Sequence, residues 1–143
     1  NNGHILNTIL GIKGDPHFSL FHILSSVFIF GGFIMIAKAW EVLYKSQKEE
    51  VLAIAGPYRY LRHPQYLGFI LIIIGFLLQW PTITTLIMAP ILIFRYIRLG
   101  KEEEHAMMKK FGSEYVKYRK VTPGYIPSLK MLSLTVNKIL KPN

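Results

Sequence analysis

The sequence contains no cysteine, and this absence removes several kinds of site at once. Without a thiol the chain has no disulfide framework, no thiolate nucleophile and no thiolate metal ligand. The five histidines do not fall at the spacings of metal ligands either. We therefore expect no metal site.

Acidic residues are scarce, with 8 Asp and Glu against 17 Lys and Arg, which gives a formal net charge of +9. At the same time 51% of the residues are hydrophobic. A soluble globular domain rarely combines these two properties. A membrane protein does so when its basic residues lie on one side of the bilayer. The basic surplus therefore predicts contact with a lipid bilayer and no nucleic-acid partner.

The chain begins at Asn1 rather than Met, and no signal-peptide pattern follows. This start is consistent with a part of a longer protein. Residues 1–17 hold a short apolar patch interrupted by glycine and proline, below the roughly 20 apolar residues that cross a bilayer. We expect an interfacial or re-entrant segment there.

The first long apolar run predicts a transmembrane helix over residues 18–44. Between residues 18 and 37 its only polar side chains are three serines and His22, which we expect to pack within the helix bundle. Gly31 and Gly32, in the middle of this run, should let another helix approach closely. The polar residues 45–65 that follow are interpreted as a connector.

A second apolar run extends from Tyr66 to Ile97. As one helix it would measure about 48 Å at 1.5 Å per residue, against a hydrocarbon core of about 30 Å. Trp80-Pro81 provides a break, because proline removes a backbone donor and suits the first turn of a new helix. The run therefore predicts a helical hairpin over residues 66–98, with helices at 66–80 and 82–98.

The charge distribution supports this hairpin. It places the connector and the tail, residues 99–143, on one side together with every Lys and Arg except Lys13. The positive-inside rule makes that side cytoplasmic. We expect one all-α, multi-pass membrane domain with three transmembrane helices and a helical cytoplasmic tail that includes a charged helix over 101–120. The bacterial inner membrane is the favoured location, and the endoplasmic reticulum is the alternative.

Two polar clusters should meet at the cytoplasmic face, residues 56–68 and residues 98–105. Histidine, aromatic, arginine and carboxylate side chains around a cleft between lipid and cytosol suit a charged cosubstrate and an amphiphilic acceptor. A structural interpretation stays open beside this one. Arg59 and Arg62 can serve only the positive-inside rule, and residues 102–104 can form a solvated helix face.

The motifs in these clusters resemble those of a known group of enzymes. They are Gly56-Pro57-Tyr58, Arg62-His63-Pro64, Tyr66, Gly68, Glu103-Glu104, Phe111-Gly112, Tyr115, Tyr118 and Pro127. Over roughly residues 50–127 the chain resembles the isoprenylcysteine carboxyl methyltransferase and phospholipid methyltransferase superfamily. These integral membrane enzymes use S-adenosylmethionine. The resemblance implies methyl transfer to a lipophilic or amphiphilic acceptor reached from the bilayer.

The resemblance also implies a set of cofactor-binding residues. They are Glu50, Val51, Leu52, Ala53, Tyr58, His63, Pro64, Gln65, Tyr66, Glu103 and Glu104. Glu103 would contact the polar end of S-adenosylmethionine.

The acceptor is less well defined. The carboxyl methyltransferases have an arginine four residues before the matching glutamate, where this chain has Leu99, with Arg98 beside it. An isoprenylcysteine-like carboxylate, a phospholipid amine and a small thiol all stay open. A carboxylate needs a cation such as Arg98 to orient it, whereas an amine or thiol needs a general base, for which His63 and Glu103 are candidates.

Two other functions stay open. Membrane sterol reductases, which use NADPH, resemble the same region, and the chain could also be a non-catalytic membrane module that binds lipid or a protein partner. The sequence makes no prediction of the oligomeric state.

Overall fold

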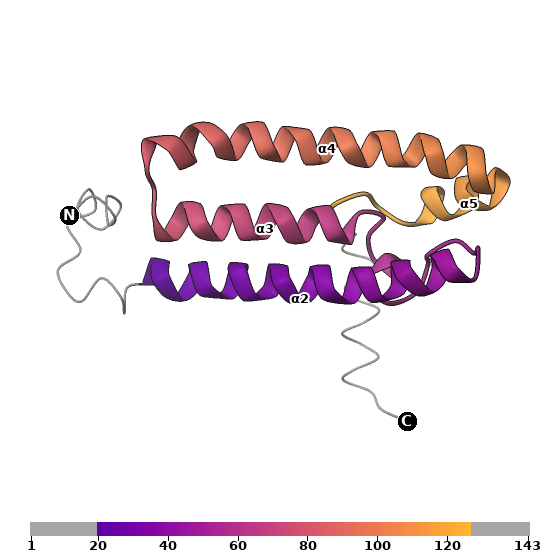
Figure 1. Ribbon diagram of the computed structural model, residues 1–143, viewed down its shortest axis with the longest axis horizontal. Helices are drawn as coiled ribbons and strands as arrows, with labels where there is room; N and C mark the ends of the chain where they lie inside the picture. The colour runs from indigo at the N-terminus through magenta and orange to yellow at the C-terminus, as the bar shows by residue number, and fades with distance from the viewer. Residues whose placement is uncertain (1–19, 127–143) are drawn as a thin grey trace, which may run out of the picture.

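The computed structural model describes residues 20–126, and this part of the chain is helical. The elements in order are α2 (Leu20–Lys48), the 3-10 helix η2 (Gly56–Arg59), α3 (Pro64–Gln79), α4 (Ile83–Phe111) and α5 (Ser113–Val121). The three long helices lie side by side with α3 in the middle, and α5 lies at the end where α2 stops (Figure 1). The all-α prediction is confirmed for these residues. The predicted segment at 1–17 and the part of the predicted tail beyond residue 126 lie outside them.

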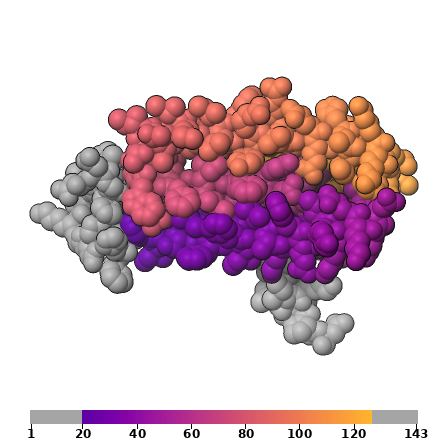
Figure 2. All heavy atoms as spheres, viewed as in Figure 1, coloured from indigo at the N-terminus to yellow at the C-terminus, as the bar shows by residue number. Residues whose placement is uncertain are grey.

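Two helices, α2 and α4, are long and apolar enough to cross a membrane, with 29 residues each. Their outer surfaces carry exposed large apolar side chains such as Phe30, Ile34 and Phe94. Figure 2 shows α2 and α4 along opposite edges of the molecule, where such side chains would face lipid. The third helix, α3, is also apolar but has only 16 residues, about 24 Å.

The contact between α2 and α3 depends on glycine. A Cβ atom on Gly32 would lie 2.6 Å from the Gly68 carbonyl oxygen, and one on Gly75 would lie 3.0 Å from the Ser25 carbonyl oxygen. The two backbones can approach this closely only because these positions carry no side chain. Gly31, by contrast, has no neighbouring atom within 4 Å of such a Cβ. The predicted close approach therefore occurs at Gly32 and not at Gly31.

The predicted break between the hairpin helices is confirmed. Helix α3 ends at Gln79, and α4 begins at Ile83 after a buried Pro81. Thr82 and Thr85 form a capping box, in which Thr85 N donates to Thr82 Oγ1 at 3.2 Å and Thr82 N donates to Thr85 Oγ1 at 2.9 Å. These two bonds satisfy backbone donors at the turn.

The second hairpin helix does not end at residue 98 as predicted but continues as α4 to Phe111. No residue between 98 and 111 interrupts the helix, and Gly100 is a buried residue within it. The first residue that does is Gly112, whose φ of 51° favours glycine. The charged helix predicted over 101–120 is consequently divided between α4 and α5.

Candidate active site

The connector and the segment after α5 run together at one end of the helices. Arg62 N donates to the Pro123 carbonyl oxygen at 2.9 Å, and His63 N donates to the Gly124 carbonyl oxygen at 3.1 Å. Tyr125 extends this contact to α4, because its hydroxyl donates to the Tyr96 carbonyl oxygen at 3.2 Å. Arg62 and His63 also contact Glu104, and Gln65 contacts Glu103, so the prediction that residues 56–68 and 98–105 lie close together is confirmed.

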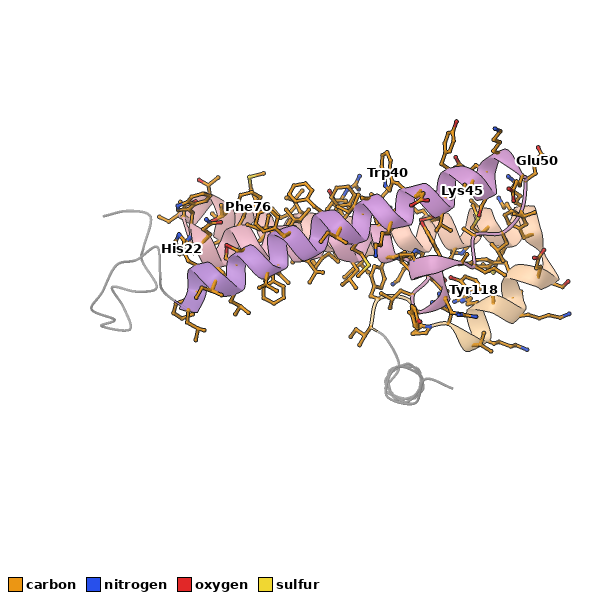
Figure 3. The ribbon with its side chains drawn as sticks, turned by 90° about the horizontal axis from the view of Figure 1, so that it is seen from below. His22, Trp40, Lys45, Glu50, Phe76 and Tyr118 are labelled. Atoms are coloured by element: carbon orange, nitrogen blue, oxygen red, sulfur yellow. The ribbon has the colours of Figure 1, made fainter. Side chains whose placement is uncertain are left out.

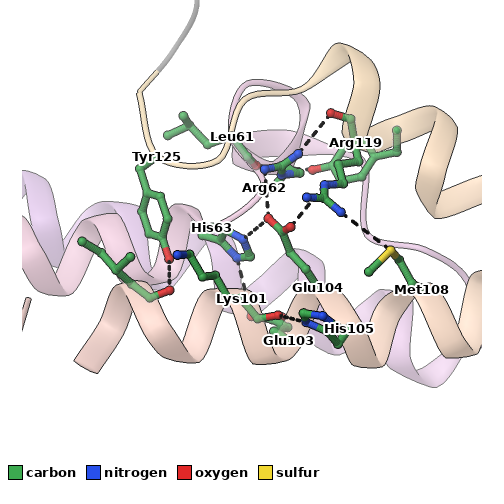
Figure 4. Close-up of polar contacts among 12 residues, drawn as sticks. Leu61, Arg62, His63, Lys101, Glu103, Glu104, His105, Met108, Arg119 and Tyr125 are labelled. Atoms are coloured by element: carbon green, nitrogen blue, oxygen red, sulfur yellow. Dashed lines mark hydrogen bonds and ion pairs between the residues drawn. The ribbon is translucent and has the colours of Figure 1, made fainter. Parts of the chain in front are cut away.

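A buried carboxylate, Glu104 on α4, is the centre of the charged groups (Figure 4). Its Oε1 atom lies 2.9 Å from Arg62 Nη2 and 3.0 Å from His63 Nε2. Its Oε2 atom lies 3.3 Å from Arg119 Nε on α5. One carboxylate thus joins the connector, α4 and α5. The side chains of Arg62 and Glu104 are largely shielded from water, so their contact is less screened than an ion pair on a surface, whereas the Arg119 side chain is 46% exposed.

The same contact determines how the imidazole of His63 is oriented. A carboxylate oxygen can only accept a hydrogen bond, so Nε2 of His63 donates to Glu104. In a neutral ring Nδ1 is then left as an acceptor. That atom is buried and has no hydrogen-bond partner among residues 20–126, and it lies 3.7 Å from Glu103 Oε2. Two acceptors facing each other suit a proton or a positively charged donor between them.

A chain of hydrogen bonds leads from Glu103 to the connector. Gln65 Nε2 donates to Glu103 Oε2 at 3.4 Å, the Tyr58 hydroxyl donates to Gln65 Oε1 at 3.0 Å, and the Tyr118 hydroxyl donates to the Tyr58 carbonyl oxygen at 2.6 Å. Burial, followed by the charge of Glu103, raises the pKa of Tyr58 above its ordinary value. Burial raises the pKa of Tyr118 as well. Both hydroxyls are therefore protonated donors at neutral pH.

These groups border a pocket between α2, the connector, α4 and α5. Six residues predicted from the sequence line it. They are Val51, Leu52, Ala53, Tyr58, His63 and Glu103. Apolar walls and a few converging polar groups are typical of a small-molecule site.

The other predicted residues lie outside the lining of this pocket. Gln65 and Glu104 contact residues that line it, and the Tyr66 ring lies 5.9 Å from that of His63. Pro64 is buried at the start of α3, and Glu50 is exposed in the turn that follows α2. Arg98 is exposed and pairs with Glu102 on its own helix at 3.1 Å. The structure does not bring Arg98 to His63 and Glu103.

Several lining residues were not among the predicted cofactor-binding residues. They are Leu43, Ser46 and Gln47 on α2, Arg62 on the connector, Met107, Lys110 and Phe111 on α4, and Tyr115 and Tyr118 on α5. The residues on α4 and α5 carried a signal, because their apolar and aromatic side chains recur at helical spacing. Those on α2 carried none, because only the return of the connector places them at the pocket.

Comparison with known proteins identifies the family. The model of the isoprenylcysteine carboxyl methyltransferase family matches residues 19–109, more than half of the chain. The chain belongs to this family, as the resemblance in its motifs predicted. Members of the family use S-adenosylmethionine as the methyl donor.

Two curated relatives agree with this assignment. A protein-S-isoprenylcysteine O-methyltransferase of Schizosaccharomyces pombe is 33% identical over 87 residues, which cover 60% of this chain and 37% of the relative. Protein-S-isoprenylcysteine O-methyltransferase B of Arabidopsis thaliana is 28% identical over 97 residues, which cover 66% of this chain and 49% of the relative. The matches thus span less than half of each relative. No solved structure matches the chain with significance.

Proposed function

We propose that the chain is an integral membrane methyltransferase that transfers a methyl group from S-adenosylmethionine to the carboxylate of an isoprenylcysteine-like acceptor. The observation that carries this proposal is the pocket in which Tyr58, His63 and Glu103 meet the apolar residues 51–53. Family membership supports the donor and the reaction. Both relatives are named as protein-S-isoprenylcysteine O-methyltransferases, which supports this acceptor over a phospholipid amine or a small thiol.

The residues of the pocket fit the proposed donor. His63 Nδ1 and Glu103 Oε2 are acceptors 3.7 Å apart, so a primary ammonium group between them would donate to both. Phe111, Tyr115 and Tyr118 add aromatic surface to the same pocket. Aromatic faces attract a cation such as a sulfonium by roughly 0.5–2 kcal/mol. When bound, S-adenosylmethionine would supply an electrophilic methyl carbon.

The proposed reaction places few demands on acid or base groups. An acceptor oxygen displaces the thioether from the methyl carbon, so one C–O bond forms as one C–S bond breaks. A carboxylate has no proton to lose, so the residues of the chain act by positioning and by exclusion of water. His63 and Glu103 hold the polar end of the donor, and Glu104 is a positioning residue that orients His63. A general base at His63 or Glu103 would be needed only for an amine or a thiol.

Arg98 stays our candidate for the cation that orients the acceptor carboxylate. Its present partner, Glu102, is an exposed carboxylate one helical turn away on α4. Exposed pairs of this kind contribute only about 0–1 kcal/mol. An incoming carboxylate could therefore replace Glu102 at small cost.

We propose the following arrangement in the membrane. Helices α2, α3 and α4 all span the bilayer, and the connector and α5 lie on the cytoplasmic side in a single membrane domain. Helix α3 is shorter than the hydrocarbon core, so we expect a polar recess at the pocket to flank its N-terminal end. The charge distribution supports this orientation, because the exposed cations cluster beyond the apolar part of α2 and α4. The inner membrane of a bacterium is favoured over the endoplasmic reticulum.

Thermal unfolding of the purified chain in detergent tests the choice of donor. We expect S-adenosylmethionine to raise the melting temperature and NADPH to leave it unchanged. His63→Ala and Glu103→Gln should abolish the shift, and Glu102→Gln, which removes an exposed neighbouring charge, should retain it. A shift with NADPH alone would favour a reductase. No shift with either ligand would favour a non-catalytic module.

A further inference from the structure

A second groove lies between α2 and the connector, outside the candidate active site. Met35 and Lys38 of α2 form one wall, and residues 54–57 with Arg59 and Tyr60 form the other. None of these residues lines the pocket that contains His63 and Glu103. The groove therefore needs its own explanation.

The sequence builds this groove with a tight turn. Gly56 has a φ of 54°, and a Cβ atom there would lie 3.0 Å from Val42 Cγ2, so the connector returns closely against α2. Pro57 then starts η2. Within this short helix Tyr58 is buried toward the active-site pocket, whereas Arg59 is exposed at the groove. One turn thus supplies a side chain to each of the two sites.

The groove carries two positive charges and no carboxylate. Lys38 and Arg59 are both exposed, and neither forms an ion pair with a carboxylate within residues 20–126. The carboxylate nearest to Lys38 along α2, Glu41, is held by Lys45 at 2.9 Å. Two cations in a shared groove, neither of them in an ion pair within residues 20–126, favour an anionic occupant.

The position of the groove along α2 indicates which anion. Immediately before Met35, the exposed side chains of Phe33 and Ile34 are apolar and suited to lipid tails. After Lys38 the exposed residues include Trp40 and Tyr44, and aromatic residues of this kind lie at the level of lipid headgroups. The groove therefore lies where the apolar surface gives way to the headgroup layer. This step rests on the membrane arrangement proposed above.

We propose that this groove binds the headgroup of an anionic phospholipid. Lys38 and Arg59 bind its phosphate, Tyr60 borders the headgroup, and the acyl chains lie along Met35 and Ile34. A zwitterionic lipid brings its own ammonium group, which opposes the two protein cations. The groove thus selects lipids of net negative charge and is separate from the acceptor of the methyl group.

Native mass spectrometry of the full chain in detergent tests this proposal, with dioleoylphosphatidylglycerol and dioleoylphosphatidylcholine as the two probes. We expect phosphatidylglycerol to bind more tightly. The double variant Lys38→Gln/Arg59→Gln should weaken its binding about tenfold or more, because each cation near an anionic lipid contributes about fivefold. Binding of phosphatidylcholine should change little.

Two further variants control for net charge and for folding. Lys48→Gln/Lys109→Gln removes two exposed cations outside the groove and should leave phosphatidylglycerol binding as in the parent. Lys38→Arg/Arg59→Lys keeps both charges and should retain binding. The proposal is wrong if the groove variant binds like the parent, if both charge-removing variants lose binding equally, or if phosphatidylcholine binds as tightly. Because no step uses S-adenosylmethionine, failure here is distinguishable from failure of the proposed methyltransferase.

Discussion

The two ends of the helical hairpin are built from different interactions. At the connector end a carboxylate, two arginines and a histidine are packed together beside a pocket. At the turn end a long-range hydrogen bond joins α2 and α3, from Ser25 Oγ to Gln79 Oε1 at 3.1 Å, and no ion pair is found there among residues 20–126. Figure 3 shows His22 and Phe76 toward the turn end and Lys45, Glu50 and Tyr118 toward the connector end.

The charged group at the connector end and the glycine contacts between α2 and α3 have different roles. Burying charges is costly unless each is paired, and the middle of the bundle is held instead by close glycine contacts that cost no desolvation. Burying Glu104 with Arg62 and His63 is therefore not an effective way to stabilise the fold. The place of this charged group beside His63 and Glu103 indicates that it positions the pocket, and the following changes test the two ends separately.

The largest effect should come from Glu104→Ala. This change leaves Arg62 and His63 buried without their shared anion, and removing one partner of a buried pair typically costs about 3–5 kcal/mol. Thermal unfolding in detergent should show a large fall in melting temperature, and donor binding should be lost. The control is Glu102→Ala, two positions away, which breaks only an exposed pair with Arg98 and should cost less than about 1 kcal/mol. Equal falls in melting temperature in Glu104→Ala and Glu102→Ala would contradict the expected difference between the buried and the exposed carboxylate.

A smaller effect is expected from Gly32→Ala, which changes the contact between α2 and α3. The added methyl group would meet the backbone oxygen of Gly68 at 2.6 Å, and overpacking of this kind costs about 1–3 kcal/mol. The neighbouring change Gly31→Ala adds the same methyl group where no atom lies within 4 Å, so it should be neutral or slightly stabilising. The melting temperatures of the two variants check this. A similar loss in both would contradict the assignment of the cost to the close contact with α3, because only Gly32 makes that contact.

Tyr58→Phe should have a modest effect confined to the connector end. It removes the hydrogen bond to Gln65, which in turn donates to Glu103, and a typical bond of this kind contributes about 1 kcal/mol. The dissociation constant for S-adenosylmethionine, measured by calorimetry, should rise about fivefold. Tyr44→Phe removes the hydroxyl of an exposed tyrosine on α2 and should leave it unchanged. If Tyr58→Phe left the dissociation constant for S-adenosylmethionine unaltered, this chain of hydrogen bonds would make no contribution to donor binding.

The smallest effect concerns alkaline pH. Burial raises the pKa of Tyr115 to about 12 and that of Tyr125 to about 12, from an ordinary value of 10. Above pH 10 the unfolded chain loses these protons while the folded chain keeps them, so stability should be constant below pH 10 and fall as the pH rises toward 12. Tyrosinate absorbance followed together with helical signal should show that these residues ionise only on unfolding. If Tyr115 and Tyr125 ionised near pH 10 while the chain was still folded, the expected effect of burial on their pKa would be wrong.

Much of the fold was accessible from the sequence because membrane helices follow simple rules of length and composition. The apolar run after residue 18 and the break at Trp80-Pro81 each predicted an element that the structure contains. The end of α4 was missed because the prediction ended this helix with the apolar run, just before Gly100 and its charged neighbours. In the fold Gly100 is instead buried at a contact with Tyr125 and His63.

The candidate site was accessible in part for a different reason. Short motifs identified Tyr58, His63 and Glu103, which do line one pocket. The sequence could not predict that Glu103 lines the pocket whereas Glu104 contacts the arginines. Adjacent residues on a helix point about 100° apart, and only the fold determines which one meets the arginines. The contribution of Leu43 and Ser46 likewise depends on the return of the connector against α2.

The central claim is tested most directly by the chemistry of the methylated product. The full chain in membranes is incubated with methyl-labelled S-adenosylmethionine and a farnesylated cysteine derivative with a free carboxylate. We predict a lipid-soluble label that mild alkali releases as methanol, as expected of a methyl ester, and that is lost in Glu103→Gln but retained in Glu102→Gln. An alkali-stable label, or a label unaffected by Glu103→Gln, would contradict carboxyl methylation at this pocket.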